Sequence, residues 1–231
     1  MAKRASSFIQ TLITAVRALA TFALYPNSKY TYTTTSEQIM RLSWNQTGQN
    51  LKVANNQPQA NDAVVKESEP VKKGGDAMQK AKHSAGDIAK WFIEKNNVPA
   101  RLYDAEDISP LKLQKLLYYA QGVFMAMTNR KLFDDDIVAW EHGPVVVSVY
   151  HDYSQYGRNG IAFTYSMRPK EEYTEEENNI LSQVYDYFGQ YSAWKLRNMT
   201  HEETPWKSTN KNDVISPKVI MDYFKKKYVE D

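Results

Sequence analysis

The strongest hydrophobic pattern in the chain lies between residues 113 and 127. Apolar side chains recur there at intervals of three and four residues, a spacing that gathers them on one face of an α-helix. Ser109 is suited to the N-cap and Pro110 to the first turn, where a missing amide hydrogen costs no bond. We therefore predict an amphipathic helix after Ser109. Its more polar side carries Lys112, Gln114, Lys115, Tyr118 and Gln121.

Four other positions carry helix-start signals. A capping box, in which Ser or Thr is followed three residues later by Glu, predicts that the first of the two begins a helix. Ser-Pro is a similar opening because proline is tolerated at the first helical position. One predicted helix starts in the Ala77 region and ends at Asn96, before Asn-Val-Pro. The other three predicted starts are Thr174 with Glu177, Thr200 with Glu203, and Ser216 with Pro217.

Two short segments have β-branched and aromatic residues typical of strands, Ile137–Trp140 and Ile161–Tyr165. We expect them to pair as a small hairpin or ribbon on a helical body. Between them, Gly143-Pro144 is predicted to turn the chain sharply, with Val145–Tyr153 entering a helix. A bulky residue at Gly143 is expected to damage folding, because few side chains tolerate the backbone conformations open to glycine.

Residues 1–54 are predicted to form a basic extension, with an amphipathic helix (8–24), a short strand (29–34) and a short helix (35–44). Residues 55–75 are polar and contain Pro58, Pro70 and Gly74-Gly75, a composition typical of a linker. The compact domain is predicted over residues 76–231. The fold class is therefore mainly α, a compact helical domain with a small β hairpin or ribbon and an N-terminal extension.

Composition narrows the range of functions. The chain has no cysteine, which excludes disulfides and thiol catalysis and agrees with a cytoplasmic location. The first 60 residues carry six Lys or Arg against one acid, so they can attract phosphates, anionic lipid or the acidic body of the chain. Because Arg17 lies within the apolar stretch of residues 8–24, we expect a helix docked on protein, not a membrane span. Contact of this helix with a membrane surface is the alternative, which partitioning of a peptide onto anionic vesicles would decide.

Motifs for common enzyme chemistry are missing from the sequence. No Gly-x-Gly phosphate loop or Gly-x-Ser-x-Gly elbow is present, and His142 and His151 lack the spacing of a zinc-binding helix. His201 stands beside two carboxylates, but a capping box explains Thr200 and Glu203 without catalysis. We therefore expect no cofactor, no metal and no catalytic residues. Acid–base catalysis by His142 or His201 with nearby glutamates is kept as an alternative.

Three segments resemble one known family in order and content. They are ISPLKLQKLLYYAQG (108–122), LFDDDIVAWEHGPVVVSVYHDY (132–153) and MTHEETPW (199–206). Together they are similar to the Panacea-domain antitoxins, also described as SocA-like or phage-associated GepA-like proteins, over about residues 84–228. The resemblance implies a compact helical fold with a small β element. It also implies a bacterial, often prophage-linked antitoxin that neutralises a cognate protein toxin by direct binding, with a ClpXP-type protease as a partner where the antitoxin acts as an adaptor.

Residues for partner contact are predicted from this resemblance and from the tyrosine-rich body, since tyrosine is favoured in binding surfaces. The partner-binding candidates are Lys112, Gln114, Lys115, Tyr118, Trp140, His142, Tyr150, Tyr153, His201 and Trp206. The residues expected to shape the motifs are Gly143, Pro144, Thr200 and Pro205.

A DNA-binding regulator that uses residues 1–54 is the main alternative function. The excess of positive charge in this region favours it, although the region has no legible helix-turn-helix. This alternative predicts salt-sensitive binding to the chain's own promoter, which removal of residues 1–75 would abolish.

Overall fold

The computed structural model describes residues 80–103, 106–169 and 172–229. The predicted extension and linker, residues 1–75, lie outside the described residues, so those assignments stay predictions. In the described part, helices dominate and a single antiparallel pair of strands is present. The predicted mainly α class with a small hairpin is confirmed. None of the described helices is long and apolar enough to cross a membrane.

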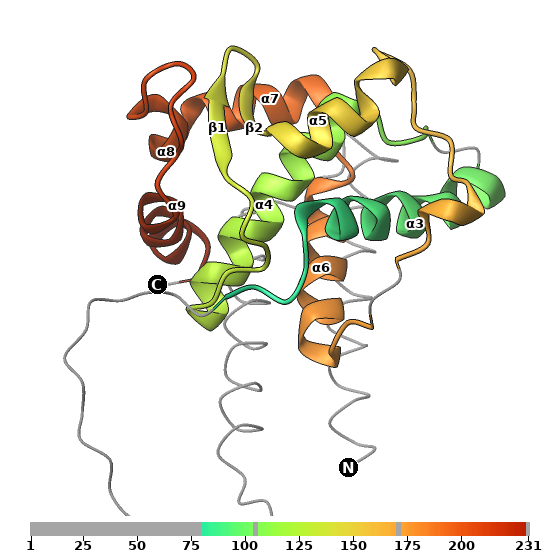
Figure 1. Ribbon diagram of the computed structural model, residues 1–231, viewed down its shortest axis with the longest axis horizontal. Coiled ribbons are helices and arrows are strands. Elements are labelled where there is room, and N and C mark those ends of the chain that lie inside the picture. The colour runs from blue at the N-terminus through green and yellow to red at the C-terminus, as the bar shows by residue number, and fades with distance from the viewer. Residues whose placement is uncertain (1–79, 104–105, 170–171, 230–231) are drawn as a thin grey trace, which may run out of the picture.

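Helix α4 (Pro110–Thr128) is the centre of the domain. As predicted, the Ser109 side chain caps it by accepting a hydrogen bond from the Lys112 amide, and the helix ends at Asn129 in a left-handed conformation. Figure 1 shows α4 in the middle, with α3 and α6 on one side and α8 and α9 on the other. Contacts with the hairpin and with helices α3, α6, α7 and α9 surround it.

The predicted polar side of α4 is not a solvent-exposed face, which corrects the expectation of an amphipathic helix. Because neighbouring elements cover the helix on all sides, Gln114, Lys115, Tyr118 and Gln121 are buried. Each then requires a partner inside the protein. The Val146 amide donates to Gln114 Oε1 at 2.7 Å, and Gln121 Nε2 donates to the Phe133 carbonyl at 2.8 Å. The polar residues of α4 thus hold the adjacent loop and strand in place.

Helix α3 (Ala85–Tyr103) begins later and ends later than predicted. Its start is fixed by a reciprocal cap, in which the Asp87 amide donates to Ser84 Oγ and Ser84 Oγ donates to Asp87 Oδ2. The Ala85 amide also donates to Asp135 Oδ2 at 2.9 Å. The backbone remains helical through the Asn-Asn-Val-Pro segment that was expected to end it.

Strands β1 (Ile137–Trp140) and β2 (Gly143–Val146) form the hairpin, with Trp140 opposite Gly143. The prediction was right for β1 and wrong for its partner. Ile161 instead donates its amide to the Ile108 carbonyl, and Tyr165–Met167 form a short 3-10 turn, η2. The chain turns at residues 141 and 142, not at Gly143-Pro144 as predicted, because Gly143 and Pro144 already belong to β2. Residues 145 and 146 also belong to β2, so helix α5 (Val147–Tyr153) starts two residues later than expected. Its continuation, Ser154–Tyr156, is a second 3-10 turn, η1.

The remaining helices confirm two of the three predicted starts. Helix α6 (Glu175–Phe188) has the predicted Thr174–Glu177 capping box, and α9 (Pro217–Phe224) opens at Ser216-Pro217 and leads into η3 (Lys225–Val229). The prediction at Thr200 was wrong. Helix α7 (Ala193–Glu202) is capped by Ser192 and has already formed when the chain reaches Thr200, while α8 (Thr204–Lys207) follows after a one-residue break.

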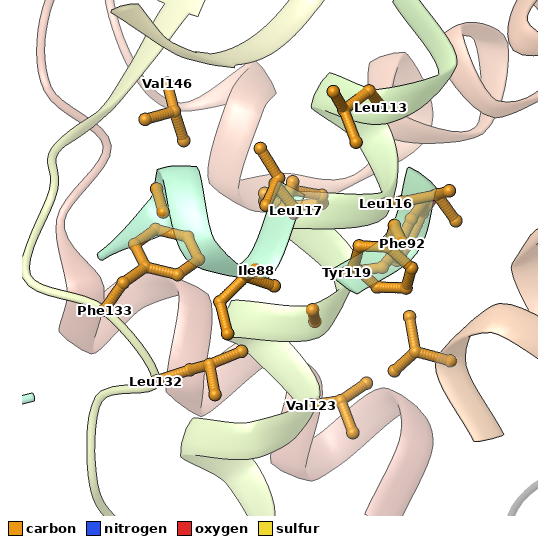
Figure 2. Close-up of a cluster of buried hydrophobic side chains, with 14 of the residues drawn as sticks. Ile88, Phe92, Leu113, Leu116, Leu117, Tyr119, Val123, Leu132, Phe133 and Val146 are labelled. Atoms are coloured by element: carbon orange, nitrogen blue, oxygen red, sulfur yellow. The ribbon is translucent and has the colours of Figure 1, made fainter. Parts of the chain in front are cut away.

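The core lies where α3, α4, the loop before β1, and β2 meet. Figure 2 shows side chains from all four pointing toward one another, with Phe92 and Phe133 among the largest. Burial of this apolar surface is the main force that holds the hairpin against α4. The core therefore fixes the position of β2, which bears the Gly-Pro motif.

Candidate functional site

The three sequence motifs meet at one buried junction, formed by Lys115 of α4, Gly143 and Pro144 of β2, and Thr200 of α7. Lys115 Nζ donates a hydrogen bond to the Pro144 carbonyl at 2.9 Å. Gly143 has a φ of +99°, and a Cβ there would lie 2.7 Å from Thr200 Oγ1 and 2.9 Å from Lys115 Nζ. Only glycine suits this position, because both the backbone angle and the close approach exclude a side chain. We call this set the Gly-Pro junction.

Lys115 has a structural role in the interior of the protein. Its side chain is fully buried, and burial, with a smaller effect of the nearby Arg197 charge, lowers its pKa to about 7. A buried ammonium is costly, so its hydrogen bond to the hairpin carbonyl is a strong constraint on where the hairpin sits. The burial of Gln114, Lys115 and Tyr118 argues against direct contact of these candidates with a partner.

A buried carboxylate lies next to this junction. Glu203 accepts hydrogen bonds from the hydroxyls of Tyr118 (2.8 Å), Tyr119 (3.0 Å) and Tyr228 (3.0 Å). Glu203 therefore does not form the predicted capping box with Thr200, because it follows α7 and points into the core. Thr200 Oγ1 instead donates to the Arg197 carbonyl. Burial raises the pKa of Glu203 to about 7, against the opposing effect of the three tyrosine bonds. The cluster joins α4, the α7–α8 break and the C-terminal turn.

The raised pKa of Glu203 predicts how stability depends on pH. The folded state binds the proton of the Glu203 carboxyl more tightly than the unfolded chain does. Protonated Glu203 therefore stabilises the fold fully below the ordinary pKa of 4.5, and this stabilisation is lost as pH rises through about 7. In the wild type, this effect should lower the free energy of unfolding by about 3 kcal/mol across this pH window. In Glu203→Gln the decrease should be absent. Urea denaturation of wild type and variant from pH 4.5 to 7.5 measures it. Equal pH slopes in the two proteins would contradict the assignment, and exposed Glu202→Gln is the matched control.

A cavity of about 440 Å³ opens beside the junction, between the hairpin and the α7–α8 segment. We call it the Trp-Arg cavity. Trp206 Nε1 donates to the Trp140 carbonyl at 2.9 Å, and the Trp206 ring stacks on His201 with ring centroids 3.7 Å apart. The Trp206 ring is thus held in a fixed position against the backbone of β1. The cavity is lined by Ala139, Trp140, Glu141, Arg197, His201, Trp206, Lys207, Thr209 and Lys211.

The predicted contact residues divide between this region and the interior. Trp140, His201 and Trp206 line the cavity, while exposed His142 lies at the hairpin turn. Exposed Tyr150 packs edge-on against Trp140 with ring centroids 4.9 Å apart. Tyr153 is buried, Lys112 is half-buried, and Pro205 is buried next to the cavity wall.

Sequence reasoning missed two residues of α7, exposed Trp194 and half-buried Arg197. Trp194 is 58% exposed, and the Arg197 guanidinium lies over its ring, 5.2 Å from the centroid. The Trp194 ring centroid is also 6.2 Å from that of His142. Three-residue spacing after the Ser192 cap places Trp194 and Arg197 on one helix face, a signal that the assumed helix start at Thr200 hid.

The imidazole of His201 lies in the cavity wall beside several cations. Burial first, then the Arg197, Lys115 and His142 charges, lower the pKa of His201. A neutral imidazole stacked on tryptophan is suited to contact with a ligand or a protein. Within the described residues, no three His, Asp or Glu side chains gather as metal ligands would.

Comparison with known proteins gives one match. The family model described as "Antitoxin SocA-like, Panacea domain" matches residues 113–207, from the first turn of α4 to the end of α8. No curated protein and no solved structure matches the chain. The matched residues include the Gly-Pro junction and most of the cavity wall, and they support a general antitoxin role. Residues 113–207 are therefore similar to the SocA-like Panacea domain, the resemblance that the three motifs predicted.

Proposed function

We propose that this chain is a non-enzymatic antitoxin of a toxin–antitoxin system, which acts in the bacterial cytoplasm and neutralises a cognate protein toxin by binding it directly. The observation that carries the proposal is the family match over residues 113–207. An antitoxin of this kind needs a surface that recognises a protein. The described residues offer a suitable one around the hairpin turn.

The recognition surface that we propose consists of Trp140, His142, Tyr150, Trp194 and Arg197. The Trp140 ring contacts that of Tyr150, the His142 ring contacts that of Trp194, and Arg197 lies over Trp194. Trp140 and Arg197 line the same cavity, which joins the two groups into one patch. Large exposed aromatic side chains and arginine are enriched at the centres of protein interfaces. Burial of the exposed Trp194 ring on binding would remove a large apolar surface from water and so favour the complex. We call this patch the hairpin face.

Coexpression with the product of the neighbouring gene tests the proposal. Wild type should restore growth, and Trp194→Ala should weaken the purified complex about tenfold or more, since a central tryptophan commonly contributes ~2 kcal/mol. Isothermal titration calorimetry gives the dissociation constants. Tyr165→Ala is the matched control, because Tyr165 is another exposed aromatic residue, 77% exposed, on η2. A neighbouring product that is harmless alone, or toxic despite wild type, would refute the antitoxin role.

Binding and catalysis are separable in the same assay. A double His142→Ala, His201→Ala variant that still binds the toxin but no longer neutralises it would indicate an enzyme. We expect neutralisation to follow the dissociation constant alone. The adaptor route through a ClpXP-type protease and DNA binding by residues 1–54 stay predictions from the resemblance and from charge.

A further inference from the structure

The Trp-Arg cavity has the size and walls of a binding site. Its volume of about 440 Å³ is within the range of pockets that enclose a small ligand or an inserted side chain. The Trp206 ring is held by its hydrogen bond to the Trp140 backbone carbonyl and by stacking on His201, and the Trp140 ring packs against Tyr150. Walls that are fixed before binding lose little conformational entropy when the cavity is filled.

The charge at this cavity favours an anion. Arg197, Lys207 and Lys211 contribute three positive charges to its lining against the single carboxylate of Glu141. Lys211 pairs with Glu141 at 3.1 Å and Lys207 with Glu202 at 2.8 Å, but both pairs are well exposed and of little energetic consequence. The excess positive charge is therefore available to an incoming group.

Among the three cations of the cavity lining, Arg197 is the one that pairs with no carboxylate of the described residues. Its Nη1 donates to exposed Asn198, and its plane covers Trp194, but no acceptor for its Nε occurs among the described residues although that atom is buried. His201 Nε2 is likewise buried without a hydrogen-bond partner in the described part of the chain. A buried donor that stays unpaired costs about 1–3 kcal/mol. Arg197 Nε is such a donor, and His201 Nε2 is one in the tautomer that carries its proton there. This cavity wall is therefore a place where an acceptor from outside completes the site.

We propose that the Trp-Arg cavity receives an acidic side chain of the toxin, a carboxylate flanked by apolar groups, with Arg197 as its counter-ion and the two tryptophans against its flanks. Charge complementarity selects this occupant, and the cavity's continuity with the hairpin face places it within one interface, since Trp140 and Arg197 belong to both. The inference rests on the proposed function. It predicts an acidic residue at the centre of the toxin's binding surface.

Charge reversal in the full chain, assayed with the cognate toxin, tests this. Arg197→Glu should raise the dissociation constant by about 100-fold, since like charges then face each other, and Arg197→Lys by about tenfold, because lysine keeps the charge without the planar fork. Lys195→Glu is the matched control, with the same charge change on an exposed residue of α7 outside the cavity. Its dissociation constant should stay within about threefold of wild type. Exposed Lys207→Glu, at the cavity rim, tests the same charge if Arg197→Glu fails to fold.

Second-site selection identifies the occupant. Toxin variants that bind Arg197→Glu again should carry an Asp or Glu changed to Lys or Arg. Suppressors that never involve an acidic residue would overturn the proposal. Equal affinity of wild type and Arg197→Glu for the toxin would also overturn the proposal, but it would leave the antitoxin role intact. Failure of the wild type to neutralise the toxin would instead refute the antitoxin role itself.

A competing occupant is tested with small anions. Inorganic phosphate and adenosine monophosphate are titrated into wild type, with tryptophan fluorescence as the readout. If either binds in a manner that Arg197→Glu abolishes and the toxin does not displace it, the cavity is a small-anion site and the proposed contact is wrong. Absence of binding, or displacement by the toxin, agrees with the acidic side chain.

Discussion

Replacing Gly143 with alanine is expected to lower the free energy of unfolding by about 2–5 kcal/mol, through backbone strain and overpacking together. The new Cβ would lie 2.7 Å from Thr200 Oγ1 and 2.9 Å from Lys115 Nζ, at a φ of +99°. Neither neighbour can retreat easily, because both are fully buried and each is hydrogen-bonded to a backbone carbonyl. Chemical denaturation followed by circular dichroism measures the loss.

Gly157→Ala is the matched control for Gly143→Ala. Gly157 also has a positive φ, +58°, but a Cβ there meets nothing within 4 Å. Only the backbone penalty remains, so a loss of about 1 kcal/mol is expected. If Gly143→Ala were as stable as wild type and lost only toxin binding, the Gly-Pro junction would be a contact surface and its structural assignment would be wrong.

Glu203→Ala is the second substitution with a large expected effect. It removes the acceptor shared by Tyr118, Tyr119 and Tyr228, and leaves three buried hydroxyls without that partner. Each unpaired group costs about 1–3 kcal/mol, partly offset because a buried carboxylate is no longer desolvated. We expect a net loss of about 3–6 kcal/mol of stability at neutral pH.

The matched control for Glu203→Ala is its neighbour Glu202, which is exposed and pairs only with exposed Lys207. Glu202→Ala should change stability by less than about 1 kcal/mol. Thermal and urea denaturation of both variants gives the comparison. Similar losses at the two positions would mean that the tyrosine cluster contributes nothing specific. Loosening of η3 in Glu203→Ala, seen as faster amide hydrogen exchange there, would further support the cluster, since Tyr228 anchors η3 through it.

Local signals in the sequence predicted the elements whose ends depend on local bonds. Ser109-Pro110, Thr174 with Glu177, and Ser216-Pro217 each open a helix in the structure. The signal failed at Thr200 with Glu203, where the same pattern lies at the end of a helix. A cap motif gives only local preference, and at this position burial of Glu203 among tyrosines from α4 and η3 determines the structure.

The pairing of β1 with β2 could not be predicted from local sequence signals, for a related reason. Residues 161–165 have strand-like composition, but β-propensity mainly reflects fit to a packed, pleated surface. β2 follows β1 after a two-residue turn, and its Val146 amide is held by Gln114 of α4. That contact spans 32 residues, which no window along the chain reveals.

By itself, the sequence determined the helical class, the presence of a small β element and the resemblance to one family, because these depend on periodicity, local backbone preference and motif order. Only the tertiary structure decided which polar residues face solvent. Lys115 and Tyr118 belong to the interior because helices surround α4 on all sides, whereas Trp194 and Arg197 lie at the surface beside the hairpin. Burial depends on contacts between residues far apart in the chain, and so the recognition surface emerges only when the elements are packed together.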